Sequence, residues 1–132
     1  MEITQSAFDA IVAQARAELP DEACGYLLGH GETAERHYAM TNVDHSPEHF
    51  AFDPAEQFNA LRYARKQKLR IVGNWHSHPA SPARPSQEDI RLANDPNINY
   101  LILSLAETEP VLNAFRIRKG QPEKIPLDII PA

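Results

Sequence analysis

The sequence predicts an α/β or α+β protein in which helices pack on a central sheet. Segments with helical periodicity alternate along the chain with short apolar runs typical of strands. The 132 residues are enough for one domain with a sizeable core, and we expect residues 1–132 to form a single domain. Hydrophobic residues make up 42% of the chain and charged residues 23%, as in ordinary globular proteins.

Three helices are expected. Apolar residues recur at helical spacing over residues 5–19, and a proline follows the run. Asp53 is an expected N-cap with proline at the first helical position, and it opens a helix to about Lys68. Ser86 is the expected cap of a third helix, which ends at about Asn94.

Strands are expected between these helices. The short, largely apolar run at residues 71–75 indicates a buried strand, and it leads directly into His76. Residues 44–53 are expected to form a loop. The other expected strands cover residues 26–29, 35–43, 100–105 and 111–117, and the tail around 125–130 is expected to add an edge strand or a short packing segment.

Charge and cysteine content exclude several classes of function. The formal net charge of −5 argues against a nucleic-acid partner, because phosphate binding requires a concentrated positive field. The single cysteine, Cys24, excludes an internal disulfide and fits a reducing cytoplasm, where we expect the protein to act. No apolar run approaches the roughly 20 residues needed to span a bilayer, and no secretion signal is apparent.

The most informative motif is His76-Ser77-His78-Pro79, followed by Ser86 and Asp89. Residues two apart in a strand point to the same side, so both histidines can approach one ion. Asp89 lies one turn into the next helix, from which its carboxylate can turn back toward them. Two imidazoles and a carboxylate, with a fourth position open, suit one catalytic zinc ion, although ligand type alone leaves Fe²⁺ and Mn²⁺ open.

Each part of the motif also has a simpler interpretation. Two histidines separated by one residue occur by chance on polar surfaces. Ser86 and Asp89 match a capping box, which requires no metal and is compatible with one. Glu22, far upstream, follows a turn and precedes an expected strand, so it is either a solvated glutamate or a base at the edge of the cleft.

Taken together, Glu22 and the motif from His76 to Asp89 match the pattern E…H-[S/T]-H-P-x₆-S-x₂-D. The chain thereby resembles the JAMM/MPN+ metalloprotease family, in particular its small prokaryotic members. The resemblance extends over nearly the whole chain. It implies a cytidine-deaminase-like α-β-α fold with a central mixed sheet, and one catalytic zinc ion.

The resemblance also implies a role for each residue. His76, His78 and Asp89 would bind zinc, Glu22 would be the general acid/base, and Ser86 would help to hold the oxyanion. The implied reaction is hydrolysis of an amide bond at the C-terminal Gly-Gly tail of a ubiquitin-like or sulfur-carrier protein. The short chain has little room for the insertions of eukaryotic relatives, which favours a small prokaryotic carrier as substrate.

Some alternatives stay open at this stage. A non-catalytic scaffold of the MPN type would have degraded ligands, whereas those of this chain are intact. A zinc deaminase would require a P-C-x-x-C motif, which one cysteine cannot supply. Cys24, His45 and His49 are further candidates for the site or for a second metal, but Pro47 disfavours a helix that would align the two histidines. The sequence does not determine the oligomeric state.

One further feature is a basic run on the second expected helix and just beyond it. The run is either a solvated face or a docking patch for an acidic carrier protein. Its members are Arg62, Arg65, Lys66, Lys68 and Arg70.

Overall fold

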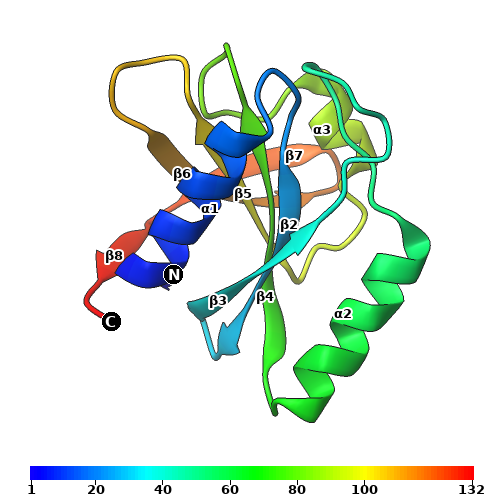
Figure 1. Cartoon of the computed structure of the whole chain (residues 1–132), viewed down its shortest axis with the longest axis vertical. Coiled ribbons are helices and arrows are strands. Elements are labelled where there is room, and N and C mark those ends of the chain that lie inside the picture. The colour runs from blue at the N-terminus through cyan, green and yellow to red at the C-terminus, as the bar shows by residue number, and fades with distance from the viewer.

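A computed structural model describes all 132 residues as one mixed sheet with three helices (Figure 1). The helices are α1 (Gln5–Ala17), α2 (Pro54–Lys66) and α3 (Gln87–Leu92). The strands are β1 (Glu2–Thr4), β2 (Cys24–His30), β3 (Thr33–Met40), β4 (Arg70–His78), β5 (Asn99–Ser104), β6 (Val111–Arg118), β7 (Gln121–Ile125) and β8 (Asp128–Ile130).

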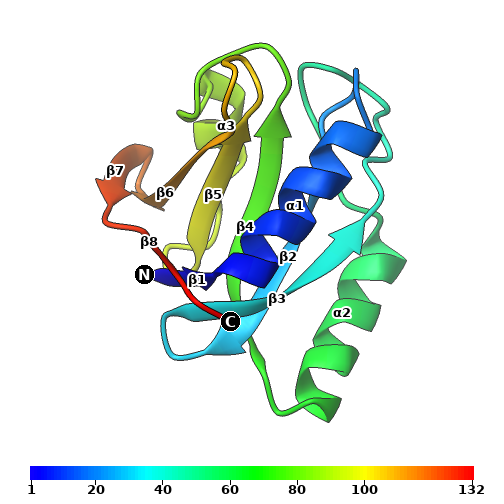
Figure 2. The ribbon, with the colours of Figure 1, turned by 60° about the vertical axis from the view of Figure 1, so that its left-hand side comes forward.

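The sheet has the strand order β7-β6-β5-β4-β2-β3-β1-β8. Its centre is the antiparallel pair β2 and β4, followed by the parallel pair β4 and β5. The two terminal segments lie together at one edge, where β8 pairs in parallel with β1 (Figure 2). In the middle of the sheet, the carboxyl end of β4 lies between β2 and β5 and is held by both.

Two apolar clusters on opposite faces of the sheet define the layers. The larger cluster packs α1 against Trp75, Leu101 and Leu103, all of which are fully buried. The smaller cluster lies on the other face, where Ile102 and Phe115 pack under residues of α3 and its preceding loop. The α-β-α layering expected from the sequence is confirmed. Trp75 belongs to the core on the α1 side of β4, beneath the histidines.

The helix starts follow from local capping chemistry. Thr4 accepts a hydrogen bond from the Ala7 amide at 3.2 Å and so begins α1. Asp53 does the same for α2 with the Ala55 amide at 2.9 Å, as the Asp-Pro sequence predicts. Each side chain satisfies a backbone donor that the helix leaves unpaired.

The boundaries differ from the sequence prediction in several places. β4 continues through His78 instead of ending at residue 75, because both neighbouring strands extend the ladder past the apolar run. The predicted first and third helices are shorter in the structure, and the strand predicted at 35–43 begins and ends earlier, at Thr33–Met40. β1 and β7 are not apparent from periodicity, because one is short and the other is mostly exposed.

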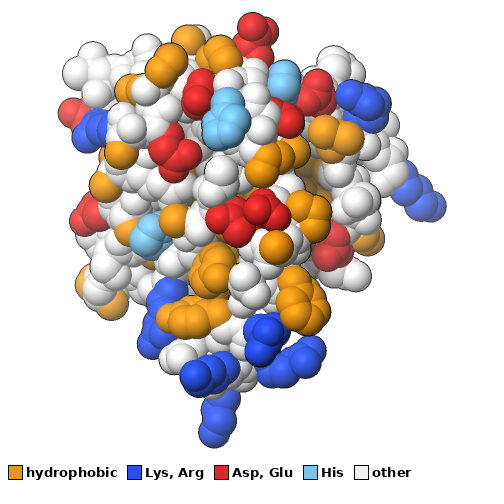
Figure 3. All heavy atoms as spheres, turned by 45° about the vertical axis from the view of Figure 1, so that its right-hand side comes forward, with side chains coloured by type: hydrophobic (Ala, Val, Ile, Leu, Met, Phe, Trp, Pro, Cys, Tyr) orange, Lys and Arg blue, Asp and Glu red, His pale blue; other side chains and the backbone are white.

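One end of the molecule is basic. Figure 3 shows a group of Lys and Arg side chains at the lower end of the view, whereas acidic and histidine side chains lie over the middle and upper part, together with a few further basic ones. The five side chains of the basic run are exposed, on α2, on the turn that follows it and at the first residue of β4, Arg70. None of the three helices has the length and apolar character that crossing a membrane requires.

Candidate metal centre

The site is built on the alternation of side chains along β4. His76 and His78 point to the face that carries α3, while Ser77 between them points to the opposite face. Both histidines are buried, with 4% and 5% of their surface exposed. Rigid strands on both sides therefore fix the two imidazoles in place before any ligand binds.

Three side chains converge at this point. His76 Nε2 lies 3.2 Å from His78 Nε2 and 3.2 Å from Asp89 Oδ2, and His78 Nε2 lies 3.1 Å from the same oxygen. Asp89 reaches them from the first turn of α3. No other group of three or more His, Cys, Asp or Glu side chains in the protein forms such a cluster.

These separations fit a metal ion. Ligand atoms at about 2.0–2.1 Å around a tetrahedral ion lie about 3.3–3.4 Å from one another, close to the distances found here. Two histidine nitrogens and one carboxylate oxygen also match the three protein ligands of a catalytic zinc site, with a fourth position open. The chemistry and spacing of the donors thus support a bound divalent cation.

The Asp89 carboxylate is held by the start of α3. Its Oδ2 accepts a hydrogen bond from the Ser86 amide at 2.9 Å, while Ser86 Oγ accepts one from the Asp89 amide at 3.0 Å. Burial alone would raise the pKa of Asp89. The hydrogen bonds from His76, His78 and Ser86 outweigh burial and hold that pKa well below its ordinary value. The Asp89 carboxylate therefore completes the capping box and also faces the two histidines as a candidate metal ligand.

The environment of each histidine fixes its ring. His78 Nδ1 lies 2.9 Å from the Pro82 carbonyl oxygen, to which it donates, and this leaves Nε2 free to bind a metal. The His76 ring is stacked on Phe50, with centroids 4.5 Å apart. Burial lowers the pKa of His76, which keeps this imidazole in the neutral form that a metal requires.

Glu22 is held beside the histidines by two hydrogen bonds of its neighbour. The Ala23 amide donates to Ser77 Oγ at 2.8 Å, and the Ser77 amide donates to the Ala23 carbonyl at 2.9 Å. The antiparallel register pairs Cys24 with His76 and, continued by two residues, places Glu22 opposite His78. Glu22 thus belongs to the same end of the sheet as the metal ligands.

The Glu22 carboxyl is strongly perturbed. The residue is 3% exposed, and its Oε1 is buried without any hydrogen-bond partner. Burial raises its pKa to about 8, against the opposing effect of His78. A buried carboxyl without a partner at the edge of a metal cluster is the environment expected of a proton-transferring group.

The Ser86 hydroxyl has a hydrogen-bond donor that is not used within the protein. Its hydroxyl oxygen accepts from the Asp89 amide, so the hydroxyl hydrogen is free to donate elsewhere. The side chain is exposed at the mouth of the site, next to Asp89. It can therefore donate to a substrate oxygen that approaches the cluster.

The other candidates from the sequence lie outside the cluster. Cys24 is fully buried, and burial raises the pKa of its thiol to about 12, so it is not a thiolate at neutral pH. His49 is exposed and pairs with Asp44 at 3.0 Å. His45 is exposed in the same loop, and neither histidine joins a metal-binding group.

Sequence reasoning missed three contributors to the site. Ser77 lies in the motif between the two histidines, and its hydroxyl ties Ala23, the neighbour of Glu22, to β4. Phe50 lies in the loop predicted at residues 44–53, and it packs directly on His76. Asn74 carried no signal except its position two residues before His76, on the same face of the strand.

Comparison with known proteins identifies the family of the chain. The family model described as prokaryotic homologs of the JAB domain matches residues 4–118. The chain belongs to this prokaryotic JAB family. The resemblance to JAMM/MPN+ proteins drawn from the motif is therefore confirmed.

Two curated relatives support membership in the JAB family. The CysO-cysteine peptidase of Mycobacterium tuberculosis is 35% identical over 125 residues, which cover 92% of this chain and 86% of the relative. A probable TtuB-protein conjugate cleaving protease of Thermus thermophilus is 36% identical over 105 residues, covering 79% of this chain and 67% of the relative.

Solved structures share the fold. The solution structure of a protein from Desulfitobacterium hafniense is 46% identical, with a TM-score of 0.87 and coverage of 99% of this chain and 92% of that chain. A JAB1/MPN domain protein from Archaeoglobus fulgidus aligns with a TM-score of 0.68 at 20% identity, covering 98% and 99%. The second likeness concerns the fold alone.

Proposed function

We propose that this JAB-family protein is a zinc-dependent peptidase or isopeptidase. The observation that carries the proposal is the convergence of two imidazole nitrogens and one carboxylate oxygen at 3.1–3.2 Å, next to a buried glutamate without a partner. His76, His78 and Asp89 would hold one zinc ion. When bound, such an ion polarises a carbonyl and lowers the pKa of a water molecule to about 7.

Two residues of the chain would act beside the ion, one in proton transfer and the other in stabilising negative charge. With the ion bound, its positive charge would lower the pKa of Glu22 from about 8 and favour the carboxylate form. The Glu22 carboxylate would then take a proton from the attacking water and deliver it to the leaving amine, a contribution of about 10²–10⁴-fold. The Ser86 hydroxyl donates to the carbonyl oxygen as negative charge develops there. Removal of one such donor typically costs about 10²–10³-fold in turnover.

The proposed substrate is a ubiquitin-like or sulfur-carrier protein that ends in a Gly-Gly-type tail. The names of two relatives, a CysO-cysteine peptidase and a conjugate cleaving protease, support this class. The scissile amide would lie at or after the tail, as in a carrier that bears an added amino acid. We place the reaction in the cytoplasm, which suits the unpaired thiol of Cys24, and treat residues 1–132 as one catalytic domain.

Incubation of the zinc-loaded protein with carrier proteins bearing C-terminal extensions, followed by intact-mass spectrometry, tests the proposal. We expect loss of the extension after the Gly-Gly end. A chelator and Glu22→Gln should each abolish cleavage, while Glu123→Gln, an exposed change on β7 and three strands away from β4 in the sheet, should not. A protein that loads zinc but cleaves no carrier, or a Glu22→Gln variant with near-normal turnover, would refute the assignment.

A further inference from the structure

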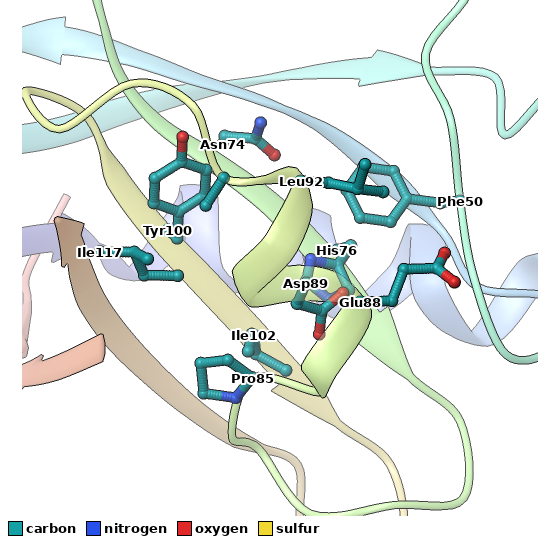
Figure 4. Close-up of a pocket in the computed structure, with 11 residues that line it drawn as sticks. Phe50, Asn74, His76, Pro85, Glu88, Asp89, Leu92, Tyr100, Ile102 and Ile117 are labelled. Atoms are coloured by element: carbon teal, nitrogen blue, oxygen red, sulfur yellow. The ribbon is translucent and has the colours of Figure 1, made fainter. Parts of the chain in front are cut away.

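A hollow adjoins the metal cluster on the face of the sheet that carries α3 (Figure 4). His76 and Asp89 form part of its lining, so it opens directly onto the cluster. Its remaining walls are largely apolar. They come from α3, from β5 and β6 and from the loop before α2, and include Phe50, Leu92, Tyr100, Ile102 and Ile117.

One polar side chain in this hollow has an acceptor atom without a partner. Asn74 Oδ1 is shielded from solvent and accepts no hydrogen bond. A buried acceptor without a donor costs about 1–3 kcal/mol, so such groups are rare in folded proteins. Asn74 lies two residues before His76 on the same face of β4. An unpaired acceptor beside an otherwise apolar wall fits a ligand that brings an N–H together with an apolar side chain.

The position of Glu22 decides which side of the substrate this hollow receives. The leaving amine must lie beside Glu22, which protonates it in the proposed reaction, and Glu22 does not line the hollow. The hollow therefore faces the acyl side, which is the tail of the carrier. Asn74 lies two residues from His76 along β4, a rise of about 6.6 Å. An extended tail covers the same distance from its last glycine to the residue that precedes the two glycines.

We propose that this hollow is the subsite for the residue that precedes the two glycines of the carrier tail. Its apolar side chain packs against Leu92, Tyr100 and Ile117, and its backbone N–H donates to Asn74 Oδ1. The Glu88 carboxylate in the lining disfavours an acidic side chain at this position. This inference rests on the proposed function and adds a specificity-determining residue, Asn74, which binds the tail without taking part in the chemistry.

The test uses an eight-residue peptide that ends in Leu-Gly-Gly and therefore cannot be cleaved further. Its Kd for the zinc-loaded, ¹⁵N-labelled protein is measured by NMR, and the side-chain amide signals of Asn74 are followed. A second peptide carries an ester in place of the leucine N–H, and a third has Asp in place of Leu. The variants are Asn74→Leu, which preserves side-chain volume, and Asn59→Leu on the exposed face of α2 as the control.

The wild-type protein should bind the ester about tenfold more weakly than the amide. The Asn74→Leu variant should bind the amide about tenfold more weakly than the wild type, with no further loss for the ester, and Asn59→Leu should match the wild type. The Asp peptide should bind at least tenfold more weakly than the Leu peptide. In carrier cleavage, Asn74→Leu should raise KM and leave kcat within about twofold.

Equal Kd values for the ester and the amide on the wild-type protein would overturn the subsite, whether or not Asn74→Leu folds. An ester penalty that is unchanged in Asn74→Leu would do the same. Either result would leave cleavage by the wild-type protein intact. Absence of any cleavage by the wild-type protein would instead count against the proposed function, so the two failures are distinguishable.

Discussion

At the scale of single residues, Glu22 and Ser77 are polar side chains buried at the end of the sheet where β4 ends. The Glu22 carboxyl is 3% exposed, and its Oε1 lacks a hydrogen-bond partner, although glutamate is rarely buried in this way. Ser77 is fully buried, and its hydroxyl is committed to the Ala23 amide at 2.8 Å. Burial of the unpaired Glu22 carboxyl costs stability, which suits its proposed role in proton transfer, whereas Ser77 holds Ala23, the residue next to Glu22, in place.

Glu22→Gln should stabilise the metal-free protein at pH 8 but not at pH 4. Burial raises the folded pKa of Glu22 from its ordinary 4.5 to about 8, so the folded state keeps its proton while the unfolded chain ionises. The wild type therefore loses stability as the pH rises from 4.5 toward 8. Urea unfolding of both proteins at the two pH values should show a gain of roughly 3 kcal/mol at pH 8. An equal difference at both values would contradict the burial of this carboxyl.

Ser77→Ala should destabilise the fold by about 1–3 kcal/mol, because the buried Ala23 amide loses its acceptor. Turnover should fall as well, because Glu22 directly precedes Ala23 and would lose its fixed position. Urea unfolding measures the first effect and carrier cleavage the second. Ser81→Ala, at an exposed position in the following loop, should change stability by less than about 0.5 kcal/mol. Equal effects of the two substitutions would show that the Ala23–Ser77 pair does not hold this end of β2.

At the scale of elements, the site depends on how closely β2, β3 and β4 approach one another. Gly25 lies in β2, and a Cβ atom there would stand 2.4 Å from the Tyr38 carbonyl oxygen and 2.9 Å from Trp75 Nε1. The glycine is needed because backbone from the adjacent strand fills the space of a side chain. Gly73 in β4 is less restricted, since the one close contact of its Cβ would be the end of the Leu101 side chain, at 2.7 Å, and its other neighbours would lie at 3.5 Å or more.

Gly25→Ala should therefore destabilise the protein by about 3 kcal/mol or more, because the obstructing atoms belong to backbone and to a buried ring. Gly73→Ala is the matched control, and its cost should be about 1 kcal/mol, because the Leu101 side chain can rotate. Thermal and urea unfolding of the two variants provide the comparison. Equal costs would mean that β3 moves aside readily at Gly25.

The elements also show what the sequence could predict. Asp53-Pro54 determined the start of α2, and the motif from His76 to Asp89 identified the residues that converge, because capping and ligand chemistry are local. The extent of β4 was not predictable, since hydrogen bonds to β5 carry the strand on through polar His76, Ser77 and His78. The proposed role of Asn74 was not predictable either, because α3, β5 and β6 line the hollow with it, a long-range arrangement that leaves no local pattern.

At the scale of the whole molecule, the proposed ion would add a bond between the central strand and a short helix that otherwise packs on the sheet through a small apolar cluster. His76 and His78 belong to the central strand, whereas Asp89 belongs to a helix of six residues with no buried side chain. A ligand that binds only the folded state stabilises it by about 2.7 kcal/mol at one hundred times its Kd. Metal binding should therefore secure α3 and the preceding loop against the sheet.

Zinc should raise the midpoint of thermal unfolding by several degrees in a concentration-dependent way, and a chelator should reverse the increase. Asp89→Asn should remove most of this response and lower the zinc content found by elemental analysis. Asn is nearly isosteric with Asp, so loss of the anionic ligand is the main change. A melting temperature independent of zinc, or an Asp89→Asn variant with full zinc content, would count against the ligand set.

The most direct measurement is a crystal structure of the zinc-soaked protein with anomalous diffraction recorded at the zinc absorption edge. We predict one strong peak per chain, within bonding distance of His76 Nε2, His78 Nε2 and Asp89 Oδ2, with the Glu22 carboxylate facing its open position. A peak elsewhere, no peak at this cluster, or a Glu22 side chain turned away from it would contradict the assignment of a hydrolytic metal centre.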